Sequence, residues 1–423
     1  MPQLAYRSIT NAVDNAQLPR HRWYPIKEGF SASLITDAVA EVRTDSRTRL
    51  LAIEPFSGSG TTPVQCALSN VSCLAFEVNP FLAFVGQAKL EQTTLRVLSN
   101  TFERVAKGIK EPLKSELESY STFSEAGGKD KWLFNKAVLR AFMGGWNSTK
   151  GLARPERTLS RLALMKAAMD NCNAYPDGKC LRYKRMDDYR SFNVSSFQAA
   201  FESYIGMMKE DLLSAPVSGN LARVERMDAR LLSSHPDKQK FDLCVTSPPY
   251  LNSFDYSDVY RPELFLSGAV RNNADLMKLR LQTVRSHVQA AWDKPVSCDF
   301  GLSYAKAFQD LLDRKERLWS DRIPSMVQAY FEDMAGLLEN LRRRAKPHAS
   351  LKIAVATSAY AGVVIPVDYI LSEIAERVGW LTEDVHIVRR LRSSGQHWKH
   401  EEHASEVPAL RESIVILKAD GRH

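Results

Sequence analysis

The chain of 423 residues has no long apolar run, because no stretch approaches the roughly 20 residues that a membrane-spanning helix needs. Its first residues, MPQLAYRSITNAVDNAQ, lack an apolar segment after a basic end, so we expect no signal peptide. Cysteine is scarce, and the six cysteines form no CxxC pair and no Cys/His cluster with zinc spacing. We therefore expect free thiols in a reducing cytoplasm, with no membrane and no metal.

The chain also lacks the phosphate-binding loop that ends in Gly-Lys-Ser/Thr. Its only Gly-Lys pairs, at positions 128–129 and 178–179, are followed by Asp and Cys. This absence excludes a nucleoside triphosphatase of the Walker type.

Composition is ordinary for a globular protein, with 44% hydrophobic and 25% charged residues. The length allows two or three domains, or one catalytic domain with large insertions. The net charge of +8 is a modest basic excess that suits a polyanionic partner.

Short apolar runs alternate with helical patterns, which predicts an α/β protein with a mostly parallel sheet. Strands are expected at Arg49–Pro55, Val71–Glu77, Leu221–Asp228, Lys240–Tyr250, Ser350–Ser358, 384–391 and 411–419. Helices are expected at 61–70, 80–90 and 365–380. Two stretches of helical pattern interrupt this alternation, from about Leu95 to Ser218 and from about Leu264 to Met326. We interpret both as insertions.

A glycine-rich turn follows the first expected strand, in the segment Glu54–Thr62 (EPFSGSGTT). Glycines let the backbone turn sharply and approach a ligand, and the amides at the following helix N-terminus favour an anionic or polar group. A dinucleotide site would need a small residue where Pro63 stands. The remaining interpretation is a turn that holds the methionine end of S-adenosylmethionine.

Two acidic residues end neighbouring strands. Glu77 is placed to accept hydrogen bonds from both hydroxyls of a ribose, a geometry that serves dinucleotides and S-adenosylmethionine alike. Its alternative role is a helix-capping acid beside Asn79. Asp228 is placed to accept a hydrogen bond from an adenine amino group, and its alternative role is a strand-end turn residue.

The motif Ser247-Pro248-Pro249-Tyr250 ends the fourth expected strand. Two consecutive prolines fix the backbone and remove two N–H donors, so the turn is stiff. The Ser247 side chain, the Pro248 carbonyl and the Tyr250 ring then form a clamp that accepts hydrogen bonds and offers a stacking face. Such a clamp suits an amino group attached to a flat aromatic ring.

Together, the segments Glu54–Thr62 and Thr246–Tyr250 resemble the amino-methylating DNA methyltransferases, S-adenosylmethionine enzymes that methylate cytosine N4 or adenine N6. The segment His21–Ser31 resembles the part of that family that precedes the glycine motif, and residues 359–379 and 411–418 resemble its closing helix and antiparallel strand. The resemblance covers about half the chain. It implies a Rossmann-like methyltransferase sheet, mostly parallel with an antiparallel closing strand, plus the helical insertions.

The resemblance also implies which residues bind the cofactor. These are Phe30, Ser31, Pro55, Phe56, Ser57, Gly58, Gly60, Thr61, Thr62, Glu77, Val78, Asn79 and Asp228.

Ser247 indicates the target atom, because the adenine enzymes usually carry Asp or Asn at that place and Ser is typical of the cytosine-N4 group. The chain has no Pro-Cys pair, which methylation of a cytosine carbon would need for its thiolate. We therefore expect direct in-line transfer to cytosine N4 after base flipping, with Ser247, Pro248, Pro249 and Tyr250 as catalytic residues. Adenine-N6 methylation of DNA and methylation of an amino group in RNA stay open. A regulatory protein with a degenerate fold would show a broken motif, and both motifs are intact.

The domain organisation that follows has five parts. They are a cofactor-binding part (1–94), a helical insertion that is a candidate target-recognition region (95–218), the second half of the sheet with the catalytic motif (219–263), a second helical insertion (264–326) and the C-terminal part of the catalytic domain (327–423).

The resemblance further implies double-stranded DNA as the partner, a role in DNA methylation or restriction-modification with a cognate restriction endonuclease, and a prokaryotic cytoplasm with nucleoid association. Basic segments that could contact phosphates lie at 181–190, 342–346 and 389–399. We favour the last of these, and expect the 342–346 run to be an ordinary helix face.

Overall fold

The computed structural model describes most of the chain. The described residues are 11–27, 29–43, 49–176, 181–185, 191–218, 220–252, 254–391 and 409–421.

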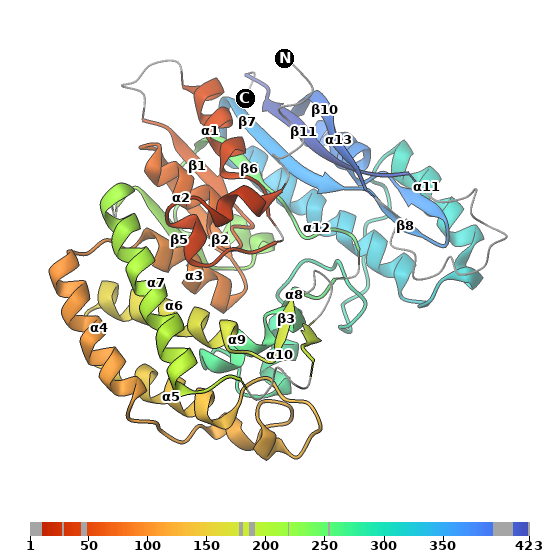
Figure 1. The fold of residues 1–423 in the computed structure, drawn as a ribbon. Helices are drawn as coiled ribbons and strands as arrows, with labels where there is room; N and C mark the ends of the chain where they lie inside the picture. Colours follow the sequence, from red (N-terminus) through yellow and green to blue (C-terminus); the bar gives the residue numbers. More distant parts are fainter. Residues whose placement is uncertain are drawn as a thin grey trace.

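A seven-stranded sheet forms the centre of the molecule, in the order β10-β11-β7-β6-β1-β2-β5 (Figure 1). Its strands are β1 (Leu51–Glu54), β2 (Ser72–Glu77), β5 (Ala222–Arg226), β6 (Phe241–Thr246), β7 (Ala345–Ala356), β10 (Trp380–Leu391) and β11 (Leu410–Ala419). The five strands from β7 to β5 are parallel, and β11 runs antiparallel to both β7 and β10. This arrangement confirms the expected mostly parallel sheet with an antiparallel closing strand.

The order of the strands reverses beside β1. The chain passes from β1 through β2 to β5 at one edge, then returns to β6 on the other side of β1 and continues towards the opposite edge. β1 and β6 are in register, with Ala52 beside Leu243 and Ile53 beside Cys244. In open α/β sheets, ligands bind beyond the carboxyl ends of the strands at such a reversal.

Helices cover both faces of the sheet. On one face lie α1 (Ala32–Val42), α2 (Thr61–Leu68) and α3 (Pro80–Leu90), and on the other lie α12 (Ile323–Arg344) and α13 (Val367–Arg377). Side chains alternate between the faces along each strand. In β6, for example, Leu243 and Val245 belong to the core on the α1–α2 side, whereas Cys244 belongs to the core on the α12–α13 side.

The first insertion is a helical lobe whose hydrophobic core is shared with α3, with residues 23–24 and with residues 259–279. Its main elements are α4 (Leu95–Ile109), α5 (Lys136–Ser148), α6 (Arg154–Asp170) and α7 (Val194–Ser214), and it lies below the sheet in orange to green in Figure 1. It also contains a small hairpin, β3 (Ala174–Pro176) and β4 (Leu181–Tyr183), and 3-10 turns at Glu116–Ser119 and Glu125–Gly127. The hairpin was not expected, because strands of three residues are too short to show a periodic pattern.

The second insertion is only partly helical. Before it lies α8 (Tyr256–Val259), and α9 (Arg261–Leu266) overlaps its start. The insertion itself carries α10 (Asn273–Arg280), α11 (Leu302–Asp313) and a 3-10 turn at Lys315–Arg317. Residues 281–301 form no helix, so the expectation of a helical stretch is wrong there. Their backbone is fixed by side chains of α12: Glu332 accepts hydrogen bonds from the amides of Val296 and Ser297 at 2.8 and 2.7 Å.

Smaller elements complete the fold. They are 3-10 turns at Ala12–Ala16, His21–Trp23 and Ala229–Ser234, and the hairpin β8 (Ser358–Tyr360) and β9 (Val363–Ile365). The five described cysteines are free thiols. Among the described residues, no helix is long and apolar enough to cross a membrane.

Candidate active site

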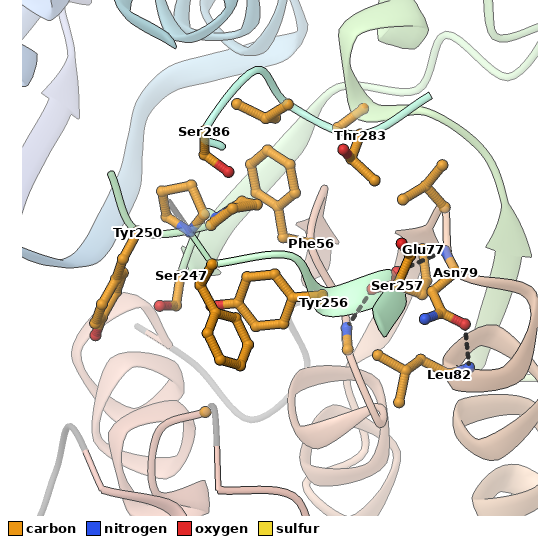
Figure 2. Close-up of a pocket in the computed structure, with 18 of the residues that line it drawn as sticks. Phe56, Glu77, Asn79, Leu82, Ser247, Tyr250, Tyr256, Ser257, Thr283 and Ser286 are labelled. Atoms are coloured by element: carbon orange, nitrogen blue, oxygen red, sulfur yellow. Dashed lines mark hydrogen bonds between the residues drawn. The ribbon is translucent and has the colours of Figure 1, made fainter. Parts of the chain in front are cut away.

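A cavity of about 340 Å³ opens beyond the carboxyl ends of β1, β2, β5 and β6, where the strand order reverses. Each of these strands contributes to its lining a residue at or just after the strand's end: Phe56, Glu77, Asp228 and Ser247. Figure 2 shows Ser247 on one side of this pocket and Glu77 on the other. The two sequence motifs therefore meet in one cavity.

The glycine turn packs against α3 more closely than any other residue type would allow. Gly60 has φ +89°, and a Cβ atom there would lie 2.8 Å from the Cα atom of Gly86. Gly58 also has a positive φ, and its amide donates a hydrogen bond to Glu77 at 2.8 Å. The amide of Ser57 donates to the Phe76 carbonyl at 2.8 Å. These contacts hold the turn against β2 and α3.

Substitution of Gly60 by alanine is expected to lower the free energy of unfolding by about 1–3 kcal/mol, because it adds a strained φ and a backbone clash. The displaced turn should also weaken binding of S-adenosylmethionine at least about tenfold. Gly206 in α7 is a matched control, since a Cβ there meets nothing within 4 Å. Its alanine variant should be as stable as the parent, or more stable by up to about 1 kcal/mol. Urea unfolding and calorimetric titration measure both quantities; equal cofactor affinities in the two variants would contradict this role of the turn.

Glu77 is buried and points its carboxylate at two backbone amides. Its oxygens accept hydrogen bonds from Gly58 and Asn79, each at 2.8 Å. Burial raises the pKa of Glu77 to about 7, opposed by these backbone hydrogen bonds. A carboxylate oxygen accepts more than one hydrogen bond, so both oxygens keep capacity for a ribose hydroxyl. The side chain of Asn79 caps α3 by accepting from the amides of Phe81 and Leu82 (Figure 2).

Asp228 lines the cavity, but Arg230 occupies its carboxylate. The guanidinium lies 2.7 Å from one carboxylate oxygen through Nη2 and 3.1 Å from both oxygens through Nε, and the Arg230 amide donates to the same side chain at 3.0 Å. The structure therefore shows the turn-capping role that was the alternative for this residue. A bond to an adenine amino group would have to share these oxygens with Arg230, and it stays a prediction.

Phe30 and Ser31 do not reach the cavity. Phe30 packs into the hydrophobic core beside α1, and Ser31 caps that helix by accepting from the amide of Ser33. The side chain of Asn15 fixes this backbone by donating to the Phe30 carbonyl at 2.9 Å. The same segment instead contributes Ile26, Lys27 and Gly29 to the cavity wall. A contact of Phe30 or Ser31 with the cofactor stays a prediction.

The other cofactor-binding residues expected from the sequence fall into two groups. Those that line the cavity are Pro55, Phe56, Gly58, Glu77, Val78, Asn79 and Asp228. Those behind its lining, in the turn and the first turn of α2, are Ser57, Gly60, Thr61 and Thr62.

All four residues of the Pro-Pro motif line the cavity. The Ser247 hydroxyl donates its proton to the Ala354 carbonyl in β7 at 3.0 Å, so its lone pairs are left to accept hydrogen bonds. The Tyr250 hydroxyl donates to Glu412 in β11 at 2.6 Å, and Glu412 in turn accepts from Arg389 in β10 at 2.6 Å. Burial, then the charge of Glu412, raises the pKa of Tyr250 well above its usual value, so the phenol stays protonated.

Glu54 joins the two motifs and was missed by the sequence assignment. This buried carboxylate accepts from the amide of Phe56 at 2.8 Å, from the hydroxyl of Thr62 at 2.9 Å and from the hydroxyl of Thr246. Its burial raises its pKa to about 7. The signal for it was present in the sequence, since Glu54, like Glu77, is an acid at the end of an apolar strand.

The cavity has further walls that no motif indicated. Phe254, Tyr256 and Tyr260 follow the Pro-Pro motif, residues 282–284 and 286–287 come from the second insertion, and Arg389 and Glu412 come from the closing strands. The residues of the second insertion and Glu412 are far from the motifs in sequence, and no local pattern marks them.

Two basic segments expected to contact phosphates lie partly outside the described residues, which do not include 186–190 or 392–399. In the third, Arg342–Lys346, the guanidinium of Arg342 donates to the Gly379 carbonyl at 2.6 Å. Among the described residues, no group of three or more His, Cys, Asp or Glu side chains could hold a metal ion.

The chemistry of the cavity fits S-adenosylmethionine. Glu77 offers acceptors for the ribose, and Phe56, Val78 and Leu82 form an apolar wall for a flat heterocycle.

No protein-family model matches the chain. It is 24% identical over 422 residues to the Type II methyltransferase M.AvaI of Nostoc sp., in an alignment that covers 90% of this chain and 83% of that protein. It is 23% identical over 466 residues to the Type II methyltransferase M.BsoBI of Geobacillus stearothermophilus, covering 97% of this chain and 87% of that protein.

Among solved structures, the chain is similar to TrmN from Thermus thermophilus, with a TM-score of 0.29 and 9% identity over 92% of this chain and 49% of that chain. It is similar to the rRNA methyltransferase aviRa from Streptomyces viridochromogenes with a TM-score of 0.30 and 11% identity over 93% of this chain and 86% of that chain. These scores are too low to support a comparison of folds. The two sequence relatives, in contrast, align along almost the whole chain, and both are named as Type II methyltransferases. The protein is thus a relative of the Type II methyltransferases, with S-adenosylmethionine as its cofactor.

Proposed function

We propose that the protein is a DNA methyltransferase that transfers a methyl group from S-adenosylmethionine to the N4 amino group of cytosine. The observation that carries this proposal is the position of Ser247. Its hydroxyl donates to the Ala354 carbonyl and therefore offers lone pairs to the cavity that also contains Glu77 and the glycine turn.

The chain's part in the reaction is to place the amino group. When bound, S-adenosylmethionine supplies a methyl group on a positively charged sulfur. Ser247 and the Pro248 carbonyl accept the two amino hydrogens, which turns the nitrogen lone pair towards that methyl group. As the nitrogen bonds to the methyl carbon, the bond from that carbon to sulfur breaks and S-adenosylhomocysteine is left. The nitrogen then loses one proton to water. Tyr250 stacks on the base. Positioning of this kind supplies a large part of the barrier reduction.

The target amino group faces its pairing partner in duplex DNA, so the base must leave the helix to enter the cavity. The relatives are named as Type II methyltransferases, and the net charge of +8 suits a polyanionic substrate. We further propose the helical lobe, residues 95–218, as the target-recognition region, because it packs on α3 and α10, whose residues Leu82 and Leu279 line the cavity. Adenine N6 and an RNA base are the alternatives.

The test is sequencing that detects modified bases, applied to DNA incubated with purified protein and S-adenosylmethionine. A Ser247→Ala/Tyr250→Ala variant is the control. Modified cytosine within one short sequence, lost in the control, is the expected result. Modified adenine would keep the mechanism and change the target atom. Absence of any modified base in DNA, with cofactor binding intact, would contradict a DNA substrate and favour RNA.

Affinity for S-adenosylmethionine is expected to rise about tenfold from pH 6 to pH 8. Burial raises the pKa of Glu77 to about 7, so the group is mostly neutral at the lower pH and mostly ionised at the higher. The ionised form accepts hydrogen bonds from both ribose hydroxyls, whereas the neutral form has given one acceptor position to its proton. Calorimetric titration at both pH values measures the change.

The control for this pH dependence is Glu77→Gln. Its amide can satisfy only one of the two backbone N–H groups, so the variant should bind more weakly, but with an affinity that does not vary between the two pH values. A pH dependence that survives in Glu77→Gln would have to come from another group, such as Glu54, whose pKa burial also raises to about 7.

A further inference from the structure

One wall of the cavity comes from the second insertion. Residues 282–284 and 286–287 line the same space as Ser247 and Tyr250. Figure 2 shows Thr283 and Ser286 on a loop on one side of Phe56, with Tyr256 on the other side. This loop lies beyond the part of the chain that carries the glycine and Pro-Pro motifs.

The loop is held firmly from behind. Arg285 points away from the cavity and pairs with Asp333 of α12 at 2.6 Å and with Glu332 at 2.7 Å. The amide of Arg285 also donates to Asp333 at 2.9 Å. Because these bonds are buried and charged, they fix the residues on either side of Arg285 and make this wall of the cavity preorganised.

His287 is the exceptional side chain in this wall. It is 2% exposed, and neither ring nitrogen makes a hydrogen bond of standard geometry with a described residue; the side chain of Gln289 is the polar group that interacts with the ring. Trp292 packs edge-on against the ring at 5.1 Å and donates its indole N–H to the His287 carbonyl at 2.8 Å, so both ring and backbone are fixed. A buried polar atom without a partner is costly, and in a cavity wall it indicates a ligand that supplies the missing bond.

The imidazole is neutral at physiological pH. Burial lowers the pKa of His287, with Arg280 acting in the same direction and Asp255 and Gln289 in the opposite one. A neutral imidazole carries one N–H donor and one acceptor. In cytosine the ring atom beside the amino group is the acceptor N3, and in adenine it is the acceptor N1.

We propose that His287 donates a hydrogen bond to this ring nitrogen of the flipped base, and thereby positions the base whose amino group Ser247 and the Pro248 carbonyl hold. The assignment rests on the proposed function. The clamp alone recognises an amino group on any flat ring, and His287 adds recognition of the acceptor next to it. A base without that acceptor would leave the imidazole N–H buried and unpaired.

The test uses a duplex containing the methylation site, and the same duplex with the ring nitrogen of the target base replaced by C–H. The probes are 3-deazacytosine or, if adenine is the target, 1-deazaadenine. For the wild type, the deaza base should lower kcat/KM about ten- to a hundredfold. His287→Ala should lower kcat/KM on the normal base by a similar factor, and the deaza base should then add less than about a twofold loss.

Controls separate this role from a structural one. His386→Ala in β10 lies away from the cavity wall and should keep the full deaza penalty. His287→Gln keeps an N–H donor and should recover part of the lost rate; it also serves if the alanine variant does not fold.

An equal deaza penalty in wild type and His287→Ala would overturn the assignment of His287 alone. A wild type that methylates no DNA at all would overturn the proposed function, and this assignment with it.

Discussion

Replacement of Ser247 by alanine should lower the rate of methyl transfer about a hundredfold, which is the effect of removing one preorganised polar group from a reacting centre. The hydroxyl is oriented by its bond to the Ala354 carbonyl at 3.0 Å, and alanine removes both that bond and the acceptor. Binding of S-adenosylmethionine should change less than about twofold, because Glu77 and the glycine turn are untouched. Single-turnover kinetics and calorimetry measure the two quantities.

Two variants sharpen this prediction. Ser247→Asn can donate an amide N–H to the Ala354 carbonyl and still present an oxygen to the substrate, so it should be more active than Ser247→Ala. Ser214→Ala removes a hydroxyl that donates to a backbone carbonyl in α7, and it should leave the rate unchanged. Similar rates for the Asn and Ala variants would contradict the role of an accepting oxygen at position 247.

Replacement of Asp211 by alanine should lower the free energy of unfolding by about 3–5 kcal/mol, as expected when one partner of a buried ion pair is removed. Asp211 is fully buried in α7 and accepts from the Arg20 amide at 2.8 Å and from the Trp23 indole at 2.8 Å. It also pairs with Arg22 at 2.6 Å. Without Asp211, the Arg20 amide and the Trp23 indole lose their hydrogen-bond acceptor, and the buried guanidinium of Arg20 loses a nearby negative charge.

Urea unfolding measures this loss, and Glu339→Ala is the control. Glu339 pairs with Arg343 on the exposed surface of α12, so its removal should cost less than about 1 kcal/mol. Asp211→Ala should also weaken cofactor binding, because the segment that it anchors continues to Ile26 and Lys27 in the cavity wall. A stability loss no larger than that of Glu339→Ala would show that the network does not hold this segment.

The sequence was a good guide where the signal is local. The strands β1, β2, β5 and β6 were expected because each is a short apolar run, bounded by a turn or an acid. The glycine turn and the Pro-Pro motif were recognisable because their backbone demands restrict which residues can occupy them. Both motifs line one cavity. This is expected once β1 and β6 are known to be neighbouring parallel strands, because each motif follows the carboxyl end of its strand.

The sequence left two local roles open at some positions. Asp228 could accept from a ligand or cap a turn; the structure shows the cap, and binding of a ligand stays a prediction. Phe30 and Ser31 lie next to Gly29, which lines the cavity, but their own side chains pack beside α1 and cap it.

By itself, the sequence determined the α/β class, most strand positions, the two motifs and the choice of S-adenosylmethionine over a nucleoside triphosphate. Only the tertiary structure decided which distant side chains complete the site. Glu54 bonds to Thr246, Tyr250 to Glu412, and His287 faces the cavity from the second insertion. The physical reason is the reversal of strand order beside β1, which brings chain segments separated by more than a hundred residues to one end of the sheet. The hydrophobic periodicity within one segment carries no information about which distant segment it will contact.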